Sequence, residues 1–318
     1  MKALEWIESA PRPSRIGLGC MTFGKTWDGQ TPLDELKPRA LAAVEASLES
    51  GINFFDHADI YCAGRSEEIF GIVVRELGVA RHSIWVQGKC GIRPGTGFDF
   101  SQAHIVGAVE GSLKRLGMEY LDSLLLHRPD ALMEPEEVAQ AFDRLHASGK
   151  VRHFGFSNQT AGQMELLRRA VRQPLRFNQI QLSLLHTQLL DEGVDFNRDL
   201  PQNPTRNHGC LEYCRLHRIV PQPWGPLAKG RLTGRESPDD DERVRGAREA
   251  VVAMATKYGV PSEAIMVAWL LRHPGHFHPL IGTTHPDRIR NASEADTIEL
   301  SREDWYALWV AGRGQRLP

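Results

Sequence analysis

Four residues that together can place a proton on a carbonyl oxygen stand at or just after three successive apolar segments. The run "NFFDHADIYC" contains Asp56 at the end of a short apolar stretch and Tyr61 shortly after it. Lys89 ends the next β-rich segment, in "VQGKCG", and His127 ends the following one, in "LLLHRPD". A tyrosine hydroxyl has a pKa of about 10, and a neighbouring ammonium group lowers it.

This set of residue types predicts a division of labour. We expect Tyr61 to donate a proton to a carbonyl oxygen, with Lys89 and Asp56 as the pair that tunes its pKa. We expect His127 to orient the substrate oxygen by a hydrogen bond. A single histidine or lysine at a strand end is more often a satisfied surface group, but four matched types on neighbouring strands indicate a functional site. These four residues are called the tetrad below.

The elements that must bring the tetrad together alternate along the chain. Strands alternating with helices predict right-handed crossovers and a parallel sheet, and eight units favour a (β/α)8 TIM barrel over an open sheet. We expect residues 1–318 to form one barrel domain, with the active site at the C-terminal ends of the strands. The expected strands lie within 15–24, 51–59, 83–90, 121–127, 151–158, 176–185, 219–227 and 276–284. The expected helices lie within 37–50, 66–78, 101–117, 135–150, 160–173, 208–218, 243–259 and 286–295.

Two segments, about 185–207 and about 230–243, are predicted to be long loops. The second contains "RLTGRESPDDDE", which is polar and punctuated by Gly and Pro. A mobile lid over a site and an ordinary solvated loop both agree with this composition.

Composition excludes several classes of protein. The formal net charge of −2 gives no excess of positive charge that would indicate binding to nucleic acid or to an anionic membrane. The sequence has no apolar run of about 18 residues, so no membrane span is expected, and the N-terminus lacks the apolar region of a signal peptide, so a cytoplasmic location is expected. The 5 cysteines are sparse and odd in number, which does not indicate a disulfide framework. The spacing in "HPGHFH" matches no zinc pattern, so no metal site is expected.

The spaced motifs resemble those of the aldo-keto reductase superfamily. "GINFFDHADIY", "GKCG", "LLLHRPD", "GFSN", "NQIQLS", "WGPLAKGRLTG" and "LIGTTHPDRI" occur in family order, from about residue 15 to about residue 312. "LLLHRPD" is typical of a bacterial branch. The resemblance implies a (β/α)8 barrel with a short N-terminal β-hairpin cap. It also implies NADPH-dependent reduction of aldehydes or ketones, with the tetrad as the catalytic residues.

The resemblance also assigns the nicotinamide and pyrophosphate part of a cofactor site. Ser157, Asn158 and Gln181 match residues that bond the nicotinamide carboxamide, although Ser157 and Asn158 could simply cap a strand end. Trp224 stands where many relatives carry a tyrosine that stacks on the nicotinamide ring, and its indole offers a larger face, but it could also be a core residue. The remaining residues assigned here are Thr22, Pro226, Leu227 and Gly230.

The adenosine end is assigned to "GTTHPDRIRNA". The resemblance implies that Arg288 stacks on adenine or pairs with a 2′-phosphate, which favours NADPH. Gly282 stands where many relatives carry a lysine, so the preference over NADH is expected to be weaker and NADH use is possible. The other residues assigned to this end are Thr283, Thr284 and Asn291.

The substrate pocket is expected to involve Met21, Phe23, Trp27, His57 and the 185–207 segment. Phe23 and Trp27 could form an apolar wall or simply pack their own loop. The identity of the carbonyl substrate and the oligomeric state cannot be read from the sequence.

Two other classes stay open at this point. A Schiff-base lyase would use Lys89 in a neutral, desolvated form, and the proximity of Asp56 argues against it because a carboxylate keeps a lysine charged. A regulatory or sensor subunit would hold NADPH with little turnover.

Overall fold

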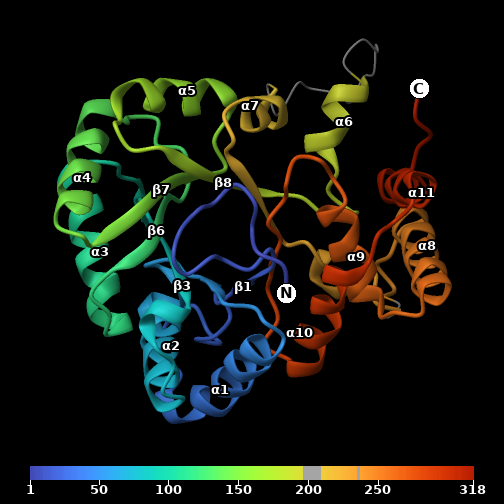
Figure 1. Cartoon of the computed structure of the whole chain (residues 1–318), viewed down its shortest axis with the longest axis horizontal. Helices are drawn as coiled ribbons and strands as arrows, with labels where there is room; N and C mark the ends of the chain where they lie inside the picture. The colour runs from blue at the N-terminus through green and yellow to red at the C-terminus, as the bar shows by residue number, and fades with distance from the viewer. Residues whose placement is uncertain (196–208, 235–236) are drawn as a thin grey trace.

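A computed structural model of the chain has the predicted closed barrel of parallel strands surrounded by helices (Figure 1). The structure describes residues 1–195, 209–234 and 237–318. The barrel strands are β1 (Gly17–Gly19), β2 (Phe54–Asp56), β3 (Trp85–Cys90), β6 (Leu121–Leu126), β7 (Val151–Ser157), β8 (Leu175–Gln181), β9 (Val220–Trp224) and β10 (Leu280–Ile281). Around the barrel, the order is β1, β10, β9, β8, β7, β6, β3 and β2. The barrel strands therefore lie side by side in the order in which they occur along the chain, and pairing of β1 with β10 closes the barrel.

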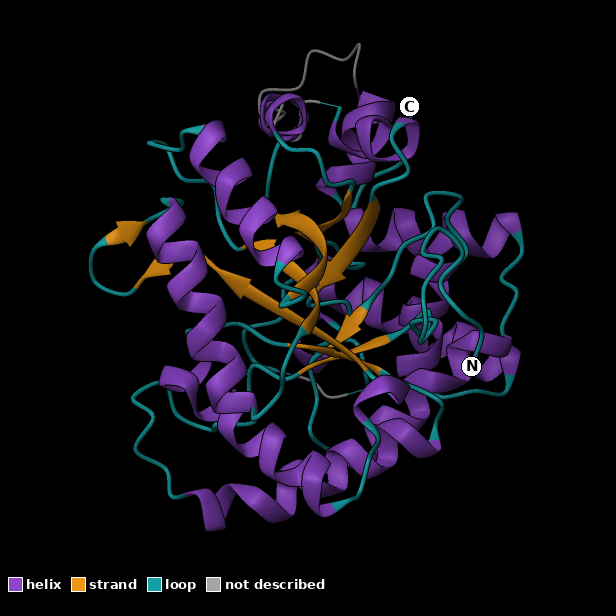
Figure 2. Cartoon of the chain, turned by 60° about the vertical axis from the view of Figure 1, so that its left-hand side comes forward, coloured by secondary structure: helices purple, strands orange, loops and turns teal. Residues whose placement is uncertain are grey.

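The helices lie outside the strands, as Figure 2 shows. They are α1 (Leu33–Glu49), α2 (Arg65–Glu76), α3 (Gln102–Leu116), α4 (Pro135–Ala147), α5 (Ala161–Ala170), α6 (Gln188–Asp195), α7 (Cys210–Leu216), α8 (Glu242–Tyr258), α9 (Ser262–Leu271), α10 (Pro286–Ser293) and α11 (Arg302–Arg313). Helix α3 illustrates how the sequence sets these bounds. The Ser101 side chain accepts the backbone N–H of His104 at the start, and Gly117, with φ 64°, ends the helix in a left-handed conformation.

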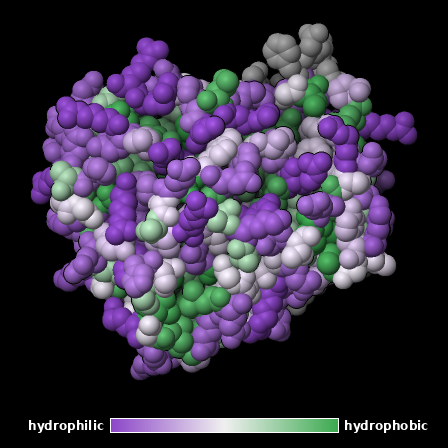
Figure 3. Space-filling model, viewed as in Figure 1, coloured by the Kyte–Doolittle hydropathy of each residue, from purple (hydrophilic) through white to green (hydrophobic). Residues whose placement is uncertain are grey.

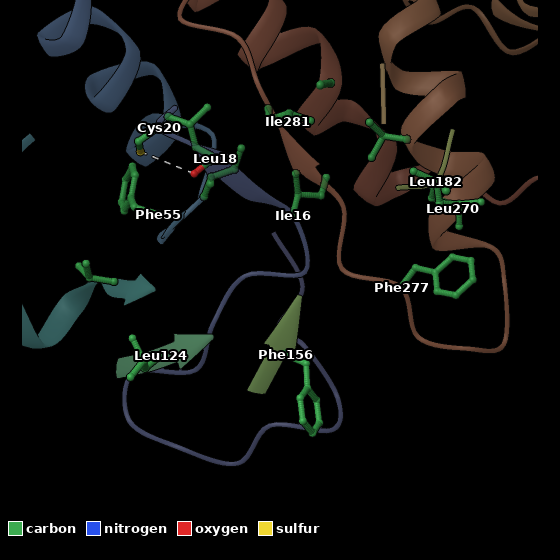
Figure 4. Close-up of a cluster of buried hydrophobic side chains, with 14 of the residues drawn as sticks. Ile16, Leu18, Cys20, Phe55, Leu124, Phe156, Leu182, Leu270, Phe277 and Ile281 are labelled. Carbon is green, nitrogen blue, oxygen red and sulfur yellow. Dashed lines mark hydrogen bonds between the residues drawn. The ribbon is translucent and has the colours of Figure 1, made fainter. Parts of the chain in front are cut away.

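Side-chain alternation divides the core into two parts. Successive residues of a strand point to opposite faces, so Phe55 packs outward against the helices while Phe54 points into the barrel. Figure 4 shows part of the outer core, where Leu18 and Cys20 lie beside Phe55. The inner core at the N-terminal ends of the strands is aromatic, and the rings of Phe54 and Trp85 stack with centroids 5.9 Å apart.

The N-terminal segment closes this end of the barrel, in the place expected for the predicted hairpin cap. It crosses in front of the strands in Figure 1. Ala3 and Ser14 form a single antiparallel bridge, and the N–H of Leu4 donates to the carbonyl of Pro13 at 2.8 Å. Leu4 and Ile7 insert into the inner aromatic core, so the cap seals the floor of the barrel from water.

Several elements differ from the sequence prediction. The segment predicted as a loop from 185 contains helix α6, and residues 196–207 lie outside the described residues. Helices α9 and α11, and a small hairpin of β4 (Ile92–Arg93) with β5 (Gly97–Phe98), were not predicted. In the other predicted loop, Asp240 is bound by the side chains of Arg231 and Arg248, which fixes this part of the chain to α8.

The face of the molecule seen in Figure 3 is largely hydrophilic, with apolar residues in smaller areas. Across the part of the chain that the structure describes, every helix is too short or too polar to cross a membrane.

The seal at the barrel floor gives a test of the fold. Ile7 is 3% exposed, so Ile7→Ala should lower the free energy of unfolding by about 2–5 kcal/mol, because it leaves a cavity in the inner core. Urea denaturation measures this change. Leu132→Ala, at a side chain that is 87% exposed, is the control and should have little effect. Equal denaturation midpoints for both variants would show that the cap does not support the barrel.

Candidate active site

Asp56 and Lys89 form an ion pair inside the barrel, on neighbouring strands β2 and β3. The Lys89 Nζ lies 2.6 and 2.7 Å from the two carboxylate oxygens of Asp56, and 2.8 Å from the carbonyl oxygen of His57. Burial disfavours the charge on the lysine, but Asp56 and Tyr61 together outweigh this effect and raise the pKa of Lys89 above its ordinary value. The lysine is therefore held as an ammonium ion.

Tyr61 reaches the barrel mouth on a turn, Tyr61–Gly64, whose backbone is unusual. Cys62 and Ala63 have φ values of 51° and 52°, a left-handed conformation that costs about 1–2 kcal/mol for each residue with a side chain. The Cys62 thiol donates to the carbonyl of Met21 at 3.3 Å, which ties the turn to the loop after β1. The surrounding structure thus imposes the conformation that directs Tyr61.

Two other members of the tetrad, Lys89 and His127, contact the Tyr61 ring. The ring lies edge-on to that of His127 with centroids 5.7 Å apart, and the Lys89 Nζ is 4.9 Å from its centroid. Burial raises the pKa of Tyr61 to about 12, against the opposing charge of Lys89, so the net direction is opposite to the lowering predicted from sequence. Burial, together with the charges of Lys89 and Arg128, lowers the pKa of His127 to about 2. At neutral pH the phenol is protonated and the imidazole is neutral.

A cavity with a volume of about 620 Å³ lies at the C-terminal ends of the strands. It extends from Tyr61 to Arg288, which are far apart in the sequence. Lys89 lies below it, fully buried. The predicted residues that border it are Met21, Thr22, Trp27, Asp56, Tyr61, His127, Ser157, Asn158, Trp224, Pro226, Leu227, Gly230, Gly282, Thr283 and Arg288.

The polar residues at the β7 end of this cavity are linked to one another. The Asn158 side-chain Nδ2 donates to the Ser157 hydroxyl at 2.8 Å, and the Trp224 indole N–H donates to the side-chain Oδ1 of Asn158 at 3.0 Å. The indole is thereby fixed at the cavity wall. Arg288 and Lys229 also border the cavity and bring positive charge, and a Cβ added at Gly282 would meet nothing within 4 Å.

Five predicted residues lie away from this cavity. Phe23 and His57 are buried in the core, where the His57 ring packs against Phe70 at 4.5 Å. The Thr284 hydroxyl accepts a hydrogen bond from Arg39 instead of facing the cavity. Asn291 lies on α10 and Gln181 borders a separate cavity of about 220 Å³.

Sequence reasoning missed other residues at the cavity. Gln179 lines it in place of Gln181, and it lies on the same face of β8 because the two are separated by one strand repeat. Arg128 follows His127 and borders both cavities, with its guanidinium 5.9 Å from the Trp224 ring. Glu263 reaches the cavity from α9, which the sequence analysis did not find.

A second group of charges lies behind the Tyr61 turn. The Asp59 N–H donates to the Lys89 carbonyl at 3.1 Å, and one carboxylate oxygen of Asp59 is buried with no hydrogen-bond partner among the described residues. Glu67 on α2 is buried and accepts from the Arg115 guanidinium at 2.7 Å. Burial and then the charge of Glu67 raise the pKa of Asp59 to about 7, with Arg115 and Lys89 acting in the opposite direction. The protonated form of Asp59 is thus the one that the fold favours.

The fold and the site together define a parallel-barrel oxidoreductase, and comparison with known proteins identifies the family. The sequence model of the Aldo/keto reductase family matches residues 15–309. The chain is 34% identical over 312 residues to the 6-dehydroglucose reductase of Agrobacterium fabrum, which covers 95% of this chain and 97% of that protein. The chain belongs to the aldo/keto reductase family, and it is an NAD(P)H-dependent reductase.

Solved structures agree with this assignment. The glycerol dehydrogenase of Gluconobacter oxydans superposes with a TM-score of 0.79 at 26% identity, covering 97% of this chain and 93% of that one. An aldo/keto reductase of Klebsiella pneumoniae in complex with NADP and acetate superposes with a TM-score of 0.71 at 25% identity, covering 93% and 90% of the two chains.

Asp59 gives a pH-dependent prediction. Its pKa is raised to about 7 in the folded chain, whereas an unfolded aspartate titrates at about 3.9. Between these values the unfolded state has lost the proton and the folded state keeps it, so this group makes stability fall as pH rises, by at most about 1.4 kcal/mol per pH unit. Asp59→Asn should remove that slope, so the variant gains stability over the wild type between about pH 4 and 7.

Urea denaturation at several pH values measures this difference. Asp34→Asn, which removes an exposed carboxylate on α1, is the control and should follow the wild type. A constant difference between Asp59→Asn and the wild type across this range would contradict the assignment of a raised pKa to Asp59.

Proposed function

We propose that the chain uses NADPH to reduce the carbonyl group of an aldehyde or ketone, with Tyr61 as the proton donor. The observation that carries the proposal is the Lys89–Asp56 ion pair, buried against the ring of Tyr61, which borders the cavity of about 620 Å³. A protonated phenol that borders a cavity, with an ammonium ion behind it, is arranged to give up its proton as negative charge develops on a nearby oxygen.

The residues along the cavity suit a nicotinamide dinucleotide. The cavity volume of about 620 Å³ is within the range of ligand sites. Ser157, Asn158 and Gln179 provide hydroxyl and amide groups for the carboxamide, and Trp224 provides a face for the nicotinamide ring. Arg288 provides a cation for a phosphate. When bound there, the reduced cofactor supplies the hydride that reaches the carbonyl carbon.

The chain's own residues then handle the proton. Tyr61 transfers its phenolic proton to the carbonyl oxygen, and Lys89 stabilises the phenolate that is left. His127 is neutral, and its Nδ1 has no hydrogen-bond partner among the described residues. The imidazole can therefore donate one hydrogen bond and hold the substrate oxygen next to Tyr61. Met21 and Trp27 border the same part of the cavity and would contact the rest of the substrate.

The geometry gives little support to a Schiff-base lyase. A nucleophilic lysine must be neutral, but the Lys89 ammonium makes three hydrogen bonds to acceptor oxygens and its pKa is raised. Lys89 also does not border the cavity, so a carbonyl carbon in the cavity would not reach its nitrogen without displacing Tyr61.

Tyr61→Phe tests the proton donor. It should lower kcat for reduction of a carbonyl substrate by about 100-fold or more, because general acid catalysis contributes about 100- to 10,000-fold. NADPH affinity, measured by quenching of tryptophan fluorescence, should change by less than about twofold, because the ring is kept. Tyr306→Phe, at a residue 37% exposed on α11, is the control for losing a hydroxyl elsewhere. Retained turnover in Tyr61→Phe would rule out this donor, and NADPH binding without turnover in the wild type would favour a regulatory role.

Cofactor choice is tested at Arg288 and Gly282. Arg288→Gln should weaken NADPH binding by about 10- to 100-fold and change NADH binding little, because a hydrogen bond to a charged group is worth about 1.5–3 kcal/mol. Gly282→Lys should increase the preference for NADPH, since a side chain has open space at this position. Dissociation constants for both cofactors measure the ratio, with Gly282→Ala as the control. An unchanged NADPH-to-NADH ratio in Arg288→Gln would place the 2′-phosphate elsewhere.

A further inference from the structure

The interior of the barrel is polar just below the tetrad, which is unusual because branched apolar residues dominate such interiors. Gln87 on β3, Gln179 on β8 and Gln222 on β9 are all buried and point inward. Ser123 on β6 pairs in register with Gln87 and joins them. Leucine or valine could have filled this space with little cost in stability, so the retained polar groups call for an explanation.

The network ends on one oxygen of the tetrad. Asp56 Oδ1 accepts from the Gln87 amide at 2.8 Å and from the Gln179 amide at 3.0 Å, in addition to the Lys89 ammonium at 2.6 Å. Asp56 Oδ2 accepts only from Lys89 in the described hydrogen bonds, at 2.7 Å. The two glutamines therefore hold one side of the carboxylate and leave the other side to the lysine.

The direction of every hydrogen bond in the network follows from the carboxylate. An ionised carboxylate only accepts, so the nitrogen of the Gln87 amide must face it, and the Gln87 oxygen must face away. That oxygen accepts from the Ser123 hydroxyl at 3.0 Å, and Ser123 in turn accepts from the Trp85 indole at 2.9 Å. The chain of donors thus points from the aromatic floor of the barrel toward Asp56.

The same reasoning continues through Gln222. The Gln87 nitrogen also donates to the Gln222 oxygen at 2.9 Å, and the Gln222 nitrogen donates back to the Gln87 oxygen at 3.3 Å and faces His278 Nδ1 at 3.1 Å. His278 must then be neutral with Nδ1 as the acceptor. Burial lowers the pKa of His278 to about 3, in agreement with a neutral ring. Gln87 is the central member, since it alone contacts Asp56, Ser123 and Gln222.

We propose that Gln87 is a positioning residue for the reductase reaction, acting through Asp56 on Lys89 and Tyr61. This inference rests on the proposed role of Tyr61 as proton donor. Gln87 fixes the rotation of the Asp56 carboxylate, and this rotation sets where the Lys89 ammonium stands relative to the phenol. The partial positive charge of the amide also reduces the negative potential that Asp56 exerts on Tyr61.

The first variant removes the hydrogen bonds and keeps the length of the side chain. Gln87→Met should lower kcat by about 10- to 100-fold at every pH, because hydrogen bonds to charged groups are worth about that factor. NADPH affinity should stay within about twofold. The pKa of Tyr61, obtained by ultraviolet titration as the difference between each protein and its Tyr61→Phe derivative, should rise, since Asp56 is then less shielded.

The second variant keeps the shape and makes the interaction depend on pH. In Gln87→Glu the introduced carboxyl group can donate to Asp56 Oδ1 only while it holds a proton. Its kcat should approach that of the wild type at low pH and fall as pH rises. Asn178→Asp is the matched control, because Asn178 is a buried amide on β8 that bonds to Gln159 and Cys210, away from Asp56. It should not produce this pH dependence.

These results separate the two proposals. If wild-type turnover does not depend on Tyr61, the proposed function fails, and the tyrosine titration still shows whether Gln87 acts on Tyr61. If wild-type turnover depends on Tyr61 but both Gln87 variants keep the wild-type kcat, pH profile and tyrosine titration within about twofold, the role of Gln87 is overturned. If Gln87→Met does not fold, the pH profile of Gln87→Glu decides.

Discussion

The ion pair between Lys89 and Asp56 is the constraint on which the rest of the site depends. Moving two charges out of water costs several kcal/mol for each ion, and only close contact with further hydrogen bonds offsets that cost. Pairing of the neighbouring strands β2 and β3 meets this condition, because it brings residues 33 positions apart in the sequence to within 2.6 Å. The carbonyl of His57 and the amides of Gln87 and Gln179 supply the further bonds. The pair is thus stable only inside this barrel, and it gives the barrel a fixed ammonium ion below its mouth.

Burial of the tetrad sets its charge state, in a way that suits a proton donor. The Lys89–Asp56 pair is neutral overall, and the same desolvation that raises the pKa of Tyr61 lowers that of His127. A phenolate has no proton to donate, so the raised pKa of Tyr61 keeps the phenol protonated before the reaction. The ammonium of Lys89 becomes effective when negative charge develops on the phenol oxygen during transfer. Lys89 and Asp56, the pair predicted to tune Tyr61, therefore act mainly on the charge that develops during proton transfer and less on the pKa of Tyr61 before the reaction.

Strand periodicity explains both the success and the limits of reading this site from sequence. Asp56, Lys89 and His127 could be placed together because inward positions alternate and neighbouring parallel strands end at the same rim. The same rule does not give the height of a residue in the barrel, so Gln181 was chosen where Gln179 borders the cavity. Beyond a strand end the rule no longer applies, and Phe23 and His57 turn into the core. Helix α9 was missed because Glu263 through Leu270 are all buried, which leaves no amphipathic stripe to recognise.

The barrel interior is therefore layered from an apolar floor to a reactive rim. Leu4 and Ile7 close the floor over the aromatic rings of Phe54 and Trp85, so water is excluded from below. In this water-poor interior a hydrogen bond is electrostatically stronger than in water, and an unpaired polar group is more costly. In the polar middle layer, hydrogen bonds to Asp56, to Ser123 and to one another leave the glutamine amides one arrangement. Nε2 of His278 is buried there with no hydrogen-bond partner among the described residues. Through this arrangement of the amides, hydrogen bonds connect Trp85 at the floor to Asp56 and hold the carboxylate in place. The positions of Lys89 and Tyr61 therefore depend on residues that do not contact the substrate.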